Sequence, residues 1–202
     1  METPFYQVDV FSNELFGGNP LAVFLLGEDF KEGQLQEAAR EMNLSETTFI
    51  FPSSHPDADF DVRVFTPEKE IPFAGHPTLG TAFVLKYAGL IPAATNHILL
   101  NFKTGLIPVQ LKEDGIISMK MPSGKILQTF SNSKEVAQCL GLKLNNICTD
   151  LPIQTATTGF PALLVPINSL NSIREIHLDL SLLKPLLEKA KADMIYPFTQ
   201  QT

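Results

Sequence analysis

Apolar and polar positions alternate along several short stretches in the first two thirds of the chain. A period of two residues is typical of strands that bury one face. A Gly-Gly-Asn-Pro sequence separates the first two stretches, as expected for a turn between strands. We therefore predict strands at Phe5–Phe11, Pro20–Leu26, Thr47–Phe51, Asp59–Phe65, His97–Phe102, Ile107–Lys112 and Ile116–Met121.

Two other stretches follow the period of a helix. Lys31–Met42 places its apolar residues on one stripe, which predicts an amphipathic helix. The second stretch, about His76–Tyr87, is apolar around most of its circumference, so its helix has to be enclosed. An enclosed helix among six or more strands favours an α+β fold in which a curled mixed sheet wraps around a central helix. A helix held between two layers is the alternative.

The sequence also contains a weak internal repeat. GNPLAVFLL and GFPALLVPI each place an apolar strand after Gly-x-Pro, and each is followed by a helical stretch and a short strand, TTFIFP or DMIYPF. A Pro-Ser-Gly-Lys break at residues 122–125 lies between the copies, so we predict one unit over residues 1–122 and a second over 126–202. The second copy stops where its own enclosed helix is due, and we expect that unit to be incomplete. Chance agreement in the order of elements is the alternative.

An incomplete second unit has a consequence for its apolar residues. Leu163, Leu164, Val165, Ile195 and Phe198 are expected to lack a packing partner within the chain. Uncovered apolar surface and open strand edges usually mark an interface. We therefore predict a homodimer or another partner for the second unit.

Composition excludes several classes of protein. The chain has 202 residues, of which 44% are hydrophobic, and a net charge of −7 without a basic cluster, which argues against nucleic acid as a partner. No apolar run reaches the length of a membrane span, so we expect no membrane partner. The two cysteines and four scattered histidines lack metal-binding spacing. We expect no metal site and a cytoplasmic location.

The sequence AGHPTLG at the start of the enclosed helix is the first candidate for chemistry. His76 stands where Ser, Thr, Asp or Asn usually caps a helix, and Pro77 follows it. Without a cap, the N–H groups of Thr78, Leu79 and Gly80 are expected to be free to bind an anion, with Gly75 allowing the chain to turn. The imidazole of His76 would then lie beside that anion. An incidental histidine in a Gly-x-Pro turn is the alternative.

Two further polar residues are candidates. Glu46, in NLSETTFIF, lies at the beginning of an apolar strand, where a carboxylate is able to act as acid or base. A solvated glutamate at a strand end, or a local partner to Ser45 and Thr47, is the alternative. Asn19 lies in the Gly-Gly-Asn-Pro turn, where asparagine is more often a turn former than a ligand contact.

Three blocks carry a family resemblance. DVFSNELFGGNPLAVF, AREMNLSETTFIF and RVFTPEKEIPFAGHPTLGTA occur in the order and spacing of the PhzF-like phenazine-biosynthesis family, whose members have the diaminopimelate-epimerase-type fold. The resemblance is strong to about residue 122 and looser in TATTGFPALLVPI. It implies two similar halves, each a curled sheet around a central helix, with the active site between them.

The resemblance also implies a function and residue roles. Family chemistry is cofactor-free isomerisation or epimerisation by proton transfer on small carboxylate-bearing molecules. By position, Glu46 matches the general acid/base, His76 a substrate-contacting histidine and Asn19 a substrate-pocket asparagine. The helix start at His76–Gly80 corresponds to the end that binds the substrate carboxylate.

One family feature is missing from the sequence. Members carry an EDPxTG-like motif at a matching helix start in the second half, and its place falls after Thr202. We therefore expect a chain that is truncated relative to the family. The leading prediction is a PhzF-like isomerase. The alternative is a catalytically inactive short form that serves as a small-acid binder or a protein-interaction module.

Overall fold

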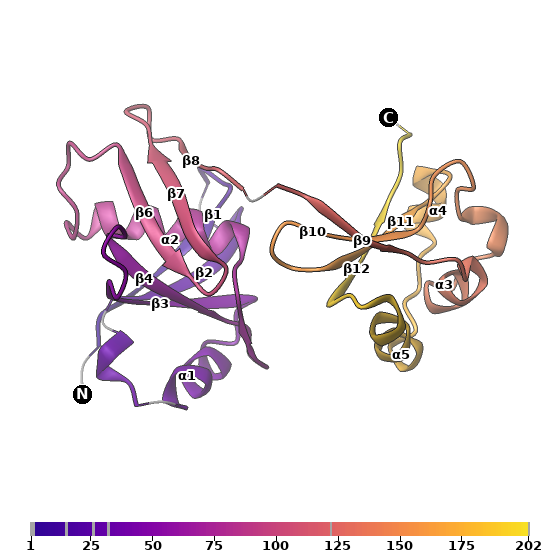
Figure 1. Ribbon diagram of the computed structural model, residues 1–202, viewed down its shortest axis with the longest axis horizontal. Coiled ribbons are helices and arrows are strands. Elements are labelled where there is room, and N and C mark those ends of the chain that lie inside the picture. The colour runs from indigo at the N-terminus through magenta and orange to yellow at the C-terminus, as the bar shows by residue number, and fades with distance from the viewer. Residues whose placement is uncertain (1–2, 15, 26, 32, 122, 202) are drawn as a thin grey trace. The chain divides into compact units, whose positions relative to one another are not determined.

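The computed structural model describes residues 3–14, 16–25, 27–31, 33–121 and 123–201. It divides into two compact units, Met1–Met121 and Pro122–Thr202, each with its own sheet (Figure 1). Helices and strands occur in both units, so the predicted α+β class is confirmed.

Unit 1 is built on one mixed sheet, which has eight strands in the part that the structure describes. The strand order is β1-β2-β3-β4-β6-β7-β8, and β5 pairs with β4. Helix α1 (Gln34–Met42) connects β2 to β3, and α2 (Gly75–Tyr87) lies between β4 and β6, so these two pairs are parallel. The strands are β1 (Phe5–Val10), β2 (Asn19–Phe24), β3 (Glu46–Pro52), β4 (Phe60–Phe65), β5 (Glu70–Ile71), β6 (His97–Phe102), β7 (Gly105–Leu111) and β8 (Ile117–Met119).

The predicted elements of unit 1 are all present, with small differences at their ends. Helix α1 begins later than predicted because Gly33 has a φ of 96°, a left-handed conformation that an α-helix does not contain. Leu26, the predicted end of the second strand, lies outside the described residues. Strand β5 was not predicted, since two residues are too few to show an alternation.

Different helices cover the two faces of the unit 1 sheet. On one face, a Cβ atom added to Gly80 of α2 would lie 2.6 Å from Leu21 Cδ2 of β2. On the same face, Thr81 Oγ1 of α2 is 2.9 Å from Thr48 Oγ1 of β3. Figure 1 shows α2 among the strands and α1 on the outside of β3. The cluster beneath α1 contains Ala22, Phe24, Leu35, Ala39, Phe49 and Phe65.

The predicted enclosure of α2 is confirmed on all sides but one. Val84 and Leu85 are fully buried, and the helix contacts β1, β2, β3, β7 and β8 of the curled sheet. Phe83 and Tyr87, however, are 47% and 70% exposed, and their rings stack with centroids 5.9 Å apart. These two residues are one turn apart and form an open apolar stripe on the helix.

Unit 2 has a mixed sheet of four strands in the order β12-β11-β10-β9. Leu163 and Val165 of β11 are fully buried in a core that includes Leu186 of α5. Their expected lack of a packing partner is therefore wrong, because helices cover this face of the sheet. The elements are β9 (Lys125–Thr129), α3 (Ser133–Cys139), β10 (Gln154–Thr157), β11 (Ala162–Pro166), α4 (Leu170–Arg174), α5 (Leu180–Ala190) and β12 (Met194–Phe198).

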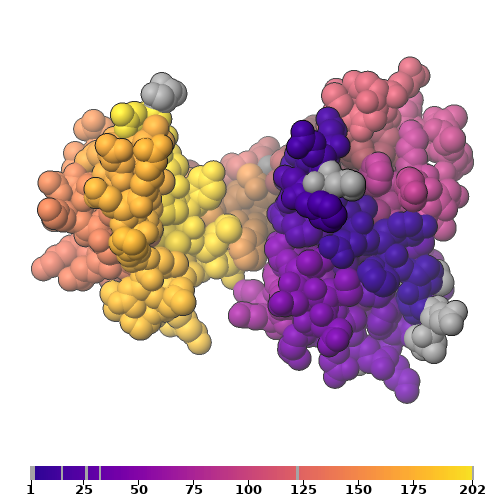
Figure 2. All heavy atoms as spheres, turned by 180° about the vertical axis from the view of Figure 1, so that it is seen from behind, coloured from indigo at the N-terminus to yellow at the C-terminus, as the bar shows by residue number. Residues whose placement is uncertain are grey.

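The opposite face of this sheet is more open. Side chains alternate along β12, so Ile195 packs against the helix-side core while Met194 and Tyr196 are exposed. Phe198 lies on the same face of β12 as Met194 and Tyr196, and Leu164 of β11 lies opposite Tyr196. Both Phe198 and Leu164 are half-buried. The segment of β12 is visible in yellow at the surface of unit 2 (Figure 2). The expectation of uncovered apolar residues thus applies to one face of the sheet only.

The strand pairing reproduces the internal repeat. Antiparallel β1–β2 is followed by α1 and a parallel β3, and antiparallel β10–β11 is followed by α4, α5 and a parallel β12. Leu21, which follows Gly-x-Pro, lies opposite Glu46, and Ala162, which also follows Gly-x-Pro, lies opposite Met194. Glu46 therefore corresponds to Met194, and the sequence alignment of TTFIFP with DMIYPF is out of register.

Candidate functional site

Three of the predicted site residues lie together at the start of α2. Asn19 Nδ2 is 3.2 Å from His76 Nδ1, and His76 Nε2 is 3.3 Å from Glu46 Oε2. Strand register explains this arrangement. Glu46 lies opposite Leu21, and Asn19, at the start of the same strand, points to the same face as Leu21. Both polar side chains therefore face α2, which contributes the imidazole.

His76 is buried and Glu46 is partly buried, and the two atoms that face each other make no hydrogen bond among the described residues. The side chain of His76 is 9% exposed and that of Glu46 is 19% exposed. Glu46 Oε2 and His76 Nε2 are close enough for an ion pair, yet neither atom has a hydrogen-bond partner among the described residues. An unsatisfied buried polar group costs about 1–3 kcal/mol. Such a pair is a candidate for contact with a bound molecule.

Burial controls the charge of the imidazole. It lowers the pKa of His76 below the ordinary value of 6.5, and the nearby charge of Glu46 opposes only part of this change. The folded chain therefore holds His76 in its neutral form at neutral pH.

The start of α2 has no side-chain cap, as predicted. Ala74, which precedes the helix, has an extended conformation and makes no side-chain capping bond. His76 is not the capping residue, however, but the second residue of the helix. The N–H groups of the first three residues of a helix have no partner within the helix. The third residue of α2 is Pro77, which has no N–H group. The free backbone donors are therefore those of Gly75 and His76.

This boundary corrects the prediction that the N–H groups of Thr78, Leu79 and Gly80 are free. They lie one turn further into the helix, where N–H groups pair with carbonyls of the preceding turn. Thr78 Oγ1 donates to Ala74 O at 2.8 Å, so its hydroxyl is also occupied. Gly80 packs closely against Leu21, where an added Cβ atom would lie 2.6 Å from Leu21 Cδ2.

Two residues near the cluster were not predicted. Ser45 Oγ donates to Asn19 Oδ1 at 3.2 Å. The ring centroid of Phe11 lies 6.5 Å from that of His76. Ser45 directly precedes Glu46, so adjacency was the available signal for it, whereas nothing in the sequence marks Phe11.

Comparison with known proteins establishes the family. Residues 8–202 match the family model described as phenazine biosynthesis-like protein, PhzC–PhzF. The chain belongs to this PhzF-like family. The resemblance of the three sequence blocks is thereby confirmed.

Individual relatives agree with this assignment. The chain is 41% identical over 149 residues to antisense-enhancing sequence 1 of Schizosaccharomyces pombe. The alignment covers 71% of this chain and 50% of that protein. It is 35% identical over 176 residues to trans-2,3-dihydro-3-hydroxyanthranilate isomerase of Pseudomonas aeruginosa, with coverage of 85% and 60%. The crystal structure of a PhzF-family protein from Bacillus anthracis superposes with a TM-score of 0.83 at 28% identity, covering 100% of this chain and 68% of that one. The chain thus spans between half and two thirds of the length of the two curated relatives.

The two repeats of this PhzF-like chain differ in chemistry. Phe160 and Met194 of unit 2 occupy the positions that Asn19 and Glu46 occupy in unit 1. Both replacements are apolar side chains that cannot exchange a proton. Among the described residues, the pair of acid and imidazole therefore belongs to unit 1.

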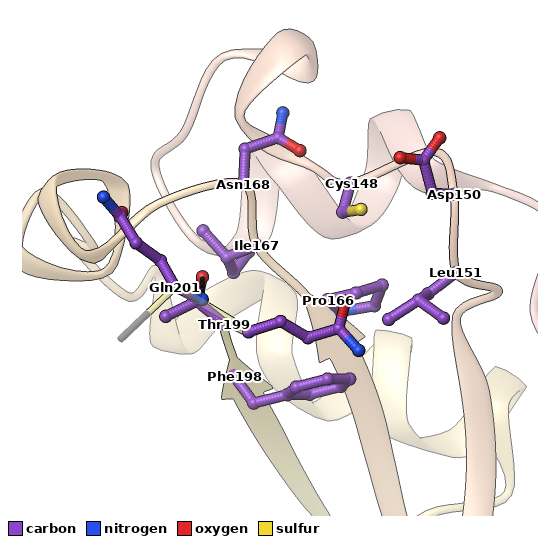
Figure 3. Close-up of a pocket in the computed structure, with 10 residues that line it drawn as sticks. Cys148, Asp150, Leu151, Pro166, Ile167, Asn168, Phe198, Thr199 and Gln201 are labelled. Atoms are coloured by element: carbon purple, nitrogen blue, oxygen red, sulfur yellow. Dashed lines mark hydrogen bonds between the residues drawn. The ribbon is translucent and has the colours of Figure 1, made fainter.

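A separate pocket of about 210 Å³ lies in unit 2 (Figure 3). Figure 3 shows Cys148 and Asp150 at its upper side and Phe198 below them. Of its ten lining residues, Asp150 is the one acidic or basic side chain. None of the predicted site residues lines it. We assign the candidate site to the start of α2 because Glu46 Oε2 and His76 Nε2 lie there as buried atoms without a hydrogen-bond partner among the described residues.

Two other kinds of site are not found in the described parts of the chain. No group of three or more His, Cys, Asp or Glu side chains in residues 3–14, 16–25, 27–31, 33–121 and 123–201 is placed to hold a metal ion. Within the same residues, no helix has both the length and the apolar character needed to cross a lipid bilayer.

The loop between β1 and β2, which lies beside the site, has an unusual backbone. Phe11 and Phe16 have φ values of 68° and 64°, which bulky side chains rarely adopt. They are also 75% and 93% exposed, and this loop is seen in indigo at the surface of unit 1 (Figure 2). The Phe16 N–H donates to Asp9 Oδ2 at 3.0 Å, which helps to hold the loop. The fold therefore maintains an exposed aromatic ring beside His76 at the expense of backbone strain.

Phe11→Asn is expected to raise the free energy of unfolding by about 0.5–1 kcal/mol, because asparagine tolerates a positive φ and the exposed ring contributes little burial. Urea unfolding measures the change. Phe5→Asn is the matched control, since Phe5 lies in β1 and stacks on Phe24 with ring centroids 5.1 Å apart. That variant is expected to lose stability. A loss of stability in Phe11→Asn would contradict the strain at this position.

The neutral state of His76 predicts a pH dependence of stability. Its folded pKa is lower than its unfolded pKa, so the unfolded state binds the proton first as the pH falls. This contribution to the free energy of unfolding is present above pH 6.5 and is lost as the pH falls through the folded pKa. Urea unfolding between about pH 8 and pH 5 is expected to show a larger loss in the parent than in His76→Gln. An equal loss in both chains would contradict the prediction.

Proposed function

We propose that unit 1 supplies the proton-transfer residues of a cofactor-independent, PhzF-type isomerase that acts on a small carboxylate-bearing molecule. One observation supports this most directly. Glu46 Oε2 and His76 Nε2 are buried 3.3 Å apart, and neither has a hydrogen-bond partner among the described residues. The name of the Pseudomonas aeruginosa relative, an isomerase of trans-2,3-dihydro-3-hydroxyanthranilate, adds a ring-containing carboxylate as the first substrate to consider.

Glu46 is the proton carrier in this proposal. Its carboxylate removes a proton from one substrate carbon, the double bond moves, and the carboxyl group returns a proton to another carbon. One C–H bond breaks and one forms, so the reaction consumes no oxidant or reductant. The Glu46 side chain is 19% exposed, so the proton that it carries is able to exchange with solvent before one is returned to the substrate.

The start of α2 holds the substrate. The N–H groups of Gly75 and His76 lack a capping side chain and lie at the positive end of the helix dipole, which favours a carboxylate. The His76 ring lies within 3.3 Å of Glu46, so a molecule bound at the helix start is placed next to the proton carrier.

Hydrogen exchange in heavy water tests the proposal. The chain is incubated in D₂O with trans-2,3-dihydro-3-hydroxyanthranilate and with a panel of small cyclic and acyclic carboxylates, and deuterium in the recovered compound is measured by mass spectrometry. Incorporation that depends on the chain and is absent after heat denaturation is expected for at least one compound. Saturable binding without deuterium incorporation would overturn the proposed isomerase activity and favour a protein that only binds small acids. The absence of both binding and incorporation, for every compound tested, would overturn the site itself.

A further inference from the structure

Four side chains of unit 1 form one continuous series of polar contacts. Ser45 Oγ is 3.2 Å from Asn19 Oδ1, Asn19 Nδ2 is 3.2 Å from His76 Nδ1, and His76 Nε2 is 3.3 Å from Glu46 Oε2. The series runs from an exposed serine to a partly buried acid. It passes through both ring nitrogens of His76, so its direction decides which nitrogen carries the proton.

Two directions of hydrogen bonding are chemically consistent for the first part of the series. In one, the Ser45 hydroxyl donates to Asn19 Oδ1, and Asn19 Nδ2 donates to a bare Nδ1 of His76. In the other, the amide of Asn19 is turned over, so that it donates to Ser45 and accepts a proton from His76 Nδ1. The first direction leaves the proton of the neutral ring on Nε2, and the second leaves it on Nδ1.

Glu46 distinguishes these directions. An ionised carboxylate offers only acceptor oxygens, and its Oε2 lies 3.3 Å from His76 Nε2. A protonated Nε2 is attracted to this oxygen, whereas a bare Nε2 would direct its lone pair at a negative charge. The contact is buried, where electrostatic differences are larger than in water. The amide of Asn19 therefore has to donate, and its oxygen is left to accept from Ser45.

We propose that Asn19 is a positioning residue that holds the neutral imidazole of His76 with its proton on Nε2, and that Ser45 fixes the orientation of the Asn19 amide. The chemical use of this arrangement rests on the proposed function. His76 then presents an N–H donor to a substrate oxygen and is not the base, which leaves proton removal to Glu46. Burial, which lowers the pKa of His76, keeps the ring neutral in the range where this choice between nitrogens matters.

His97 offers an internal contrast in the same chain. Its Nδ1 lies 2.8 Å from Asn96 Oδ1, and an amide oxygen accepts but does not donate. This ring is therefore expected to carry its proton on Nδ1 when it is neutral and in this contact. The two histidines pair with opposite ends of an asparagine amide and are expected to favour opposite tautomers.

Nitrogen NMR of the ¹⁵N-labelled full chain tests the proposal without any substrate. Protonated and bare ring nitrogens have distinct ¹⁵N shifts, and His76→Gln assigns the signals of His76. The parent at pH 7.5 is expected to show a protonated Nε2 and a bare Nδ1. In Asn19→Asp, the carboxylate accepts at Nδ1, so Nδ1 is expected to become protonated. Ser45→Ala is expected to give a smaller change in the same direction.

Asn96→Asp is the matched control, because it replaces one acceptor with another and is expected to leave the His76 signals unchanged. A protonated Nδ1 in the parent, or His76 signals that Asn19→Asp leaves unchanged in a folded chain, would overturn the proposal. Circular dichroism checks the folding of each variant, and the parent spectrum decides even if a variant does not fold. The NMR measurement does not depend on turnover. The proposed tautomer of His76 and the proposed isomerase activity can therefore be overturned independently of each other.

Discussion

Glu46→Gln is expected to lower the rate of substrate deuterium exchange by about 100-fold to 10,000-fold, the range that a positioned acid or base contributes. The amide has nearly the same shape as the carboxyl group but cannot take up and return a proton. It also leaves the apolar packing of β3 unchanged, so the melting temperature is expected to stay close to that of the parent. The exchange assay in D₂O and a thermal melt measure the two effects.

Glu41→Gln is the control for this substitution. Glu41 is an exposed residue of α1, on the side of the sheet away from His76, and the same change of charge there is expected to leave exchange unaffected. Exchange by Glu46→Gln within a few-fold of the parent would remove Glu46 from the mechanism. A comparable loss in both variants would show that net charge, rather than the position of one carboxylate, controls the rate.

Gly80→Val is expected to lower the free energy of unfolding by at least about 2 kcal/mol, because it overfills a packed interface. A Cβ atom alone would lie 2.6 Å from Leu21 Cδ2 and 2.9 Å from Val10 Cγ2, and valine adds two methyl groups. The helix has to move away from β1 and β2 to accept them. His76 lies on the same helix, so exchange activity is expected to fall together with stability. Urea unfolding and the exchange assay measure both.

Tyr87→Val introduces the same residue into the same helix and serves as the control. Tyr87 is 70% exposed on the open stripe of α2 and its ring contacts Tyr6 and Phe83, so its replacement is expected to lower the free energy of unfolding by about 1 kcal/mol, less than Gly80→Val. If Gly80→Val were as stable as the parent, the close packing of α2 against the sheet would be wrong. A normal rate of exchange in a destabilised Gly80→Val would separate the helix position from the chemistry.

The sequence by itself determined the elements whose pattern is local. Strands such as His97–Phe102 show an alternation of apolar and polar residues because one face is buried. The apolar residues around most of α2 predicted a helix with neighbours on most sides. The family followed from three blocks of sequence, and these same blocks contain Asn19, Glu46 and His76. Each of these inferences needs only residues that are close together in the chain.

Only the tertiary structure decided features that depend on register and on the reach of side chains between elements. The start of α2 lies at Gly75 because the backbone of Ala74 is extended, which moves the free donors by one turn from the predicted ones. The role of Gly80 is set by Leu21, which lies in another element. The hydrogen-bond direction at His76 depends on Asn19 from β2 and Glu46 from β3, which pairing of β2 with β3 brings to one face. A one-residue change in that register would turn either side chain to the opposite face, and no local pattern fixes the register that strongly.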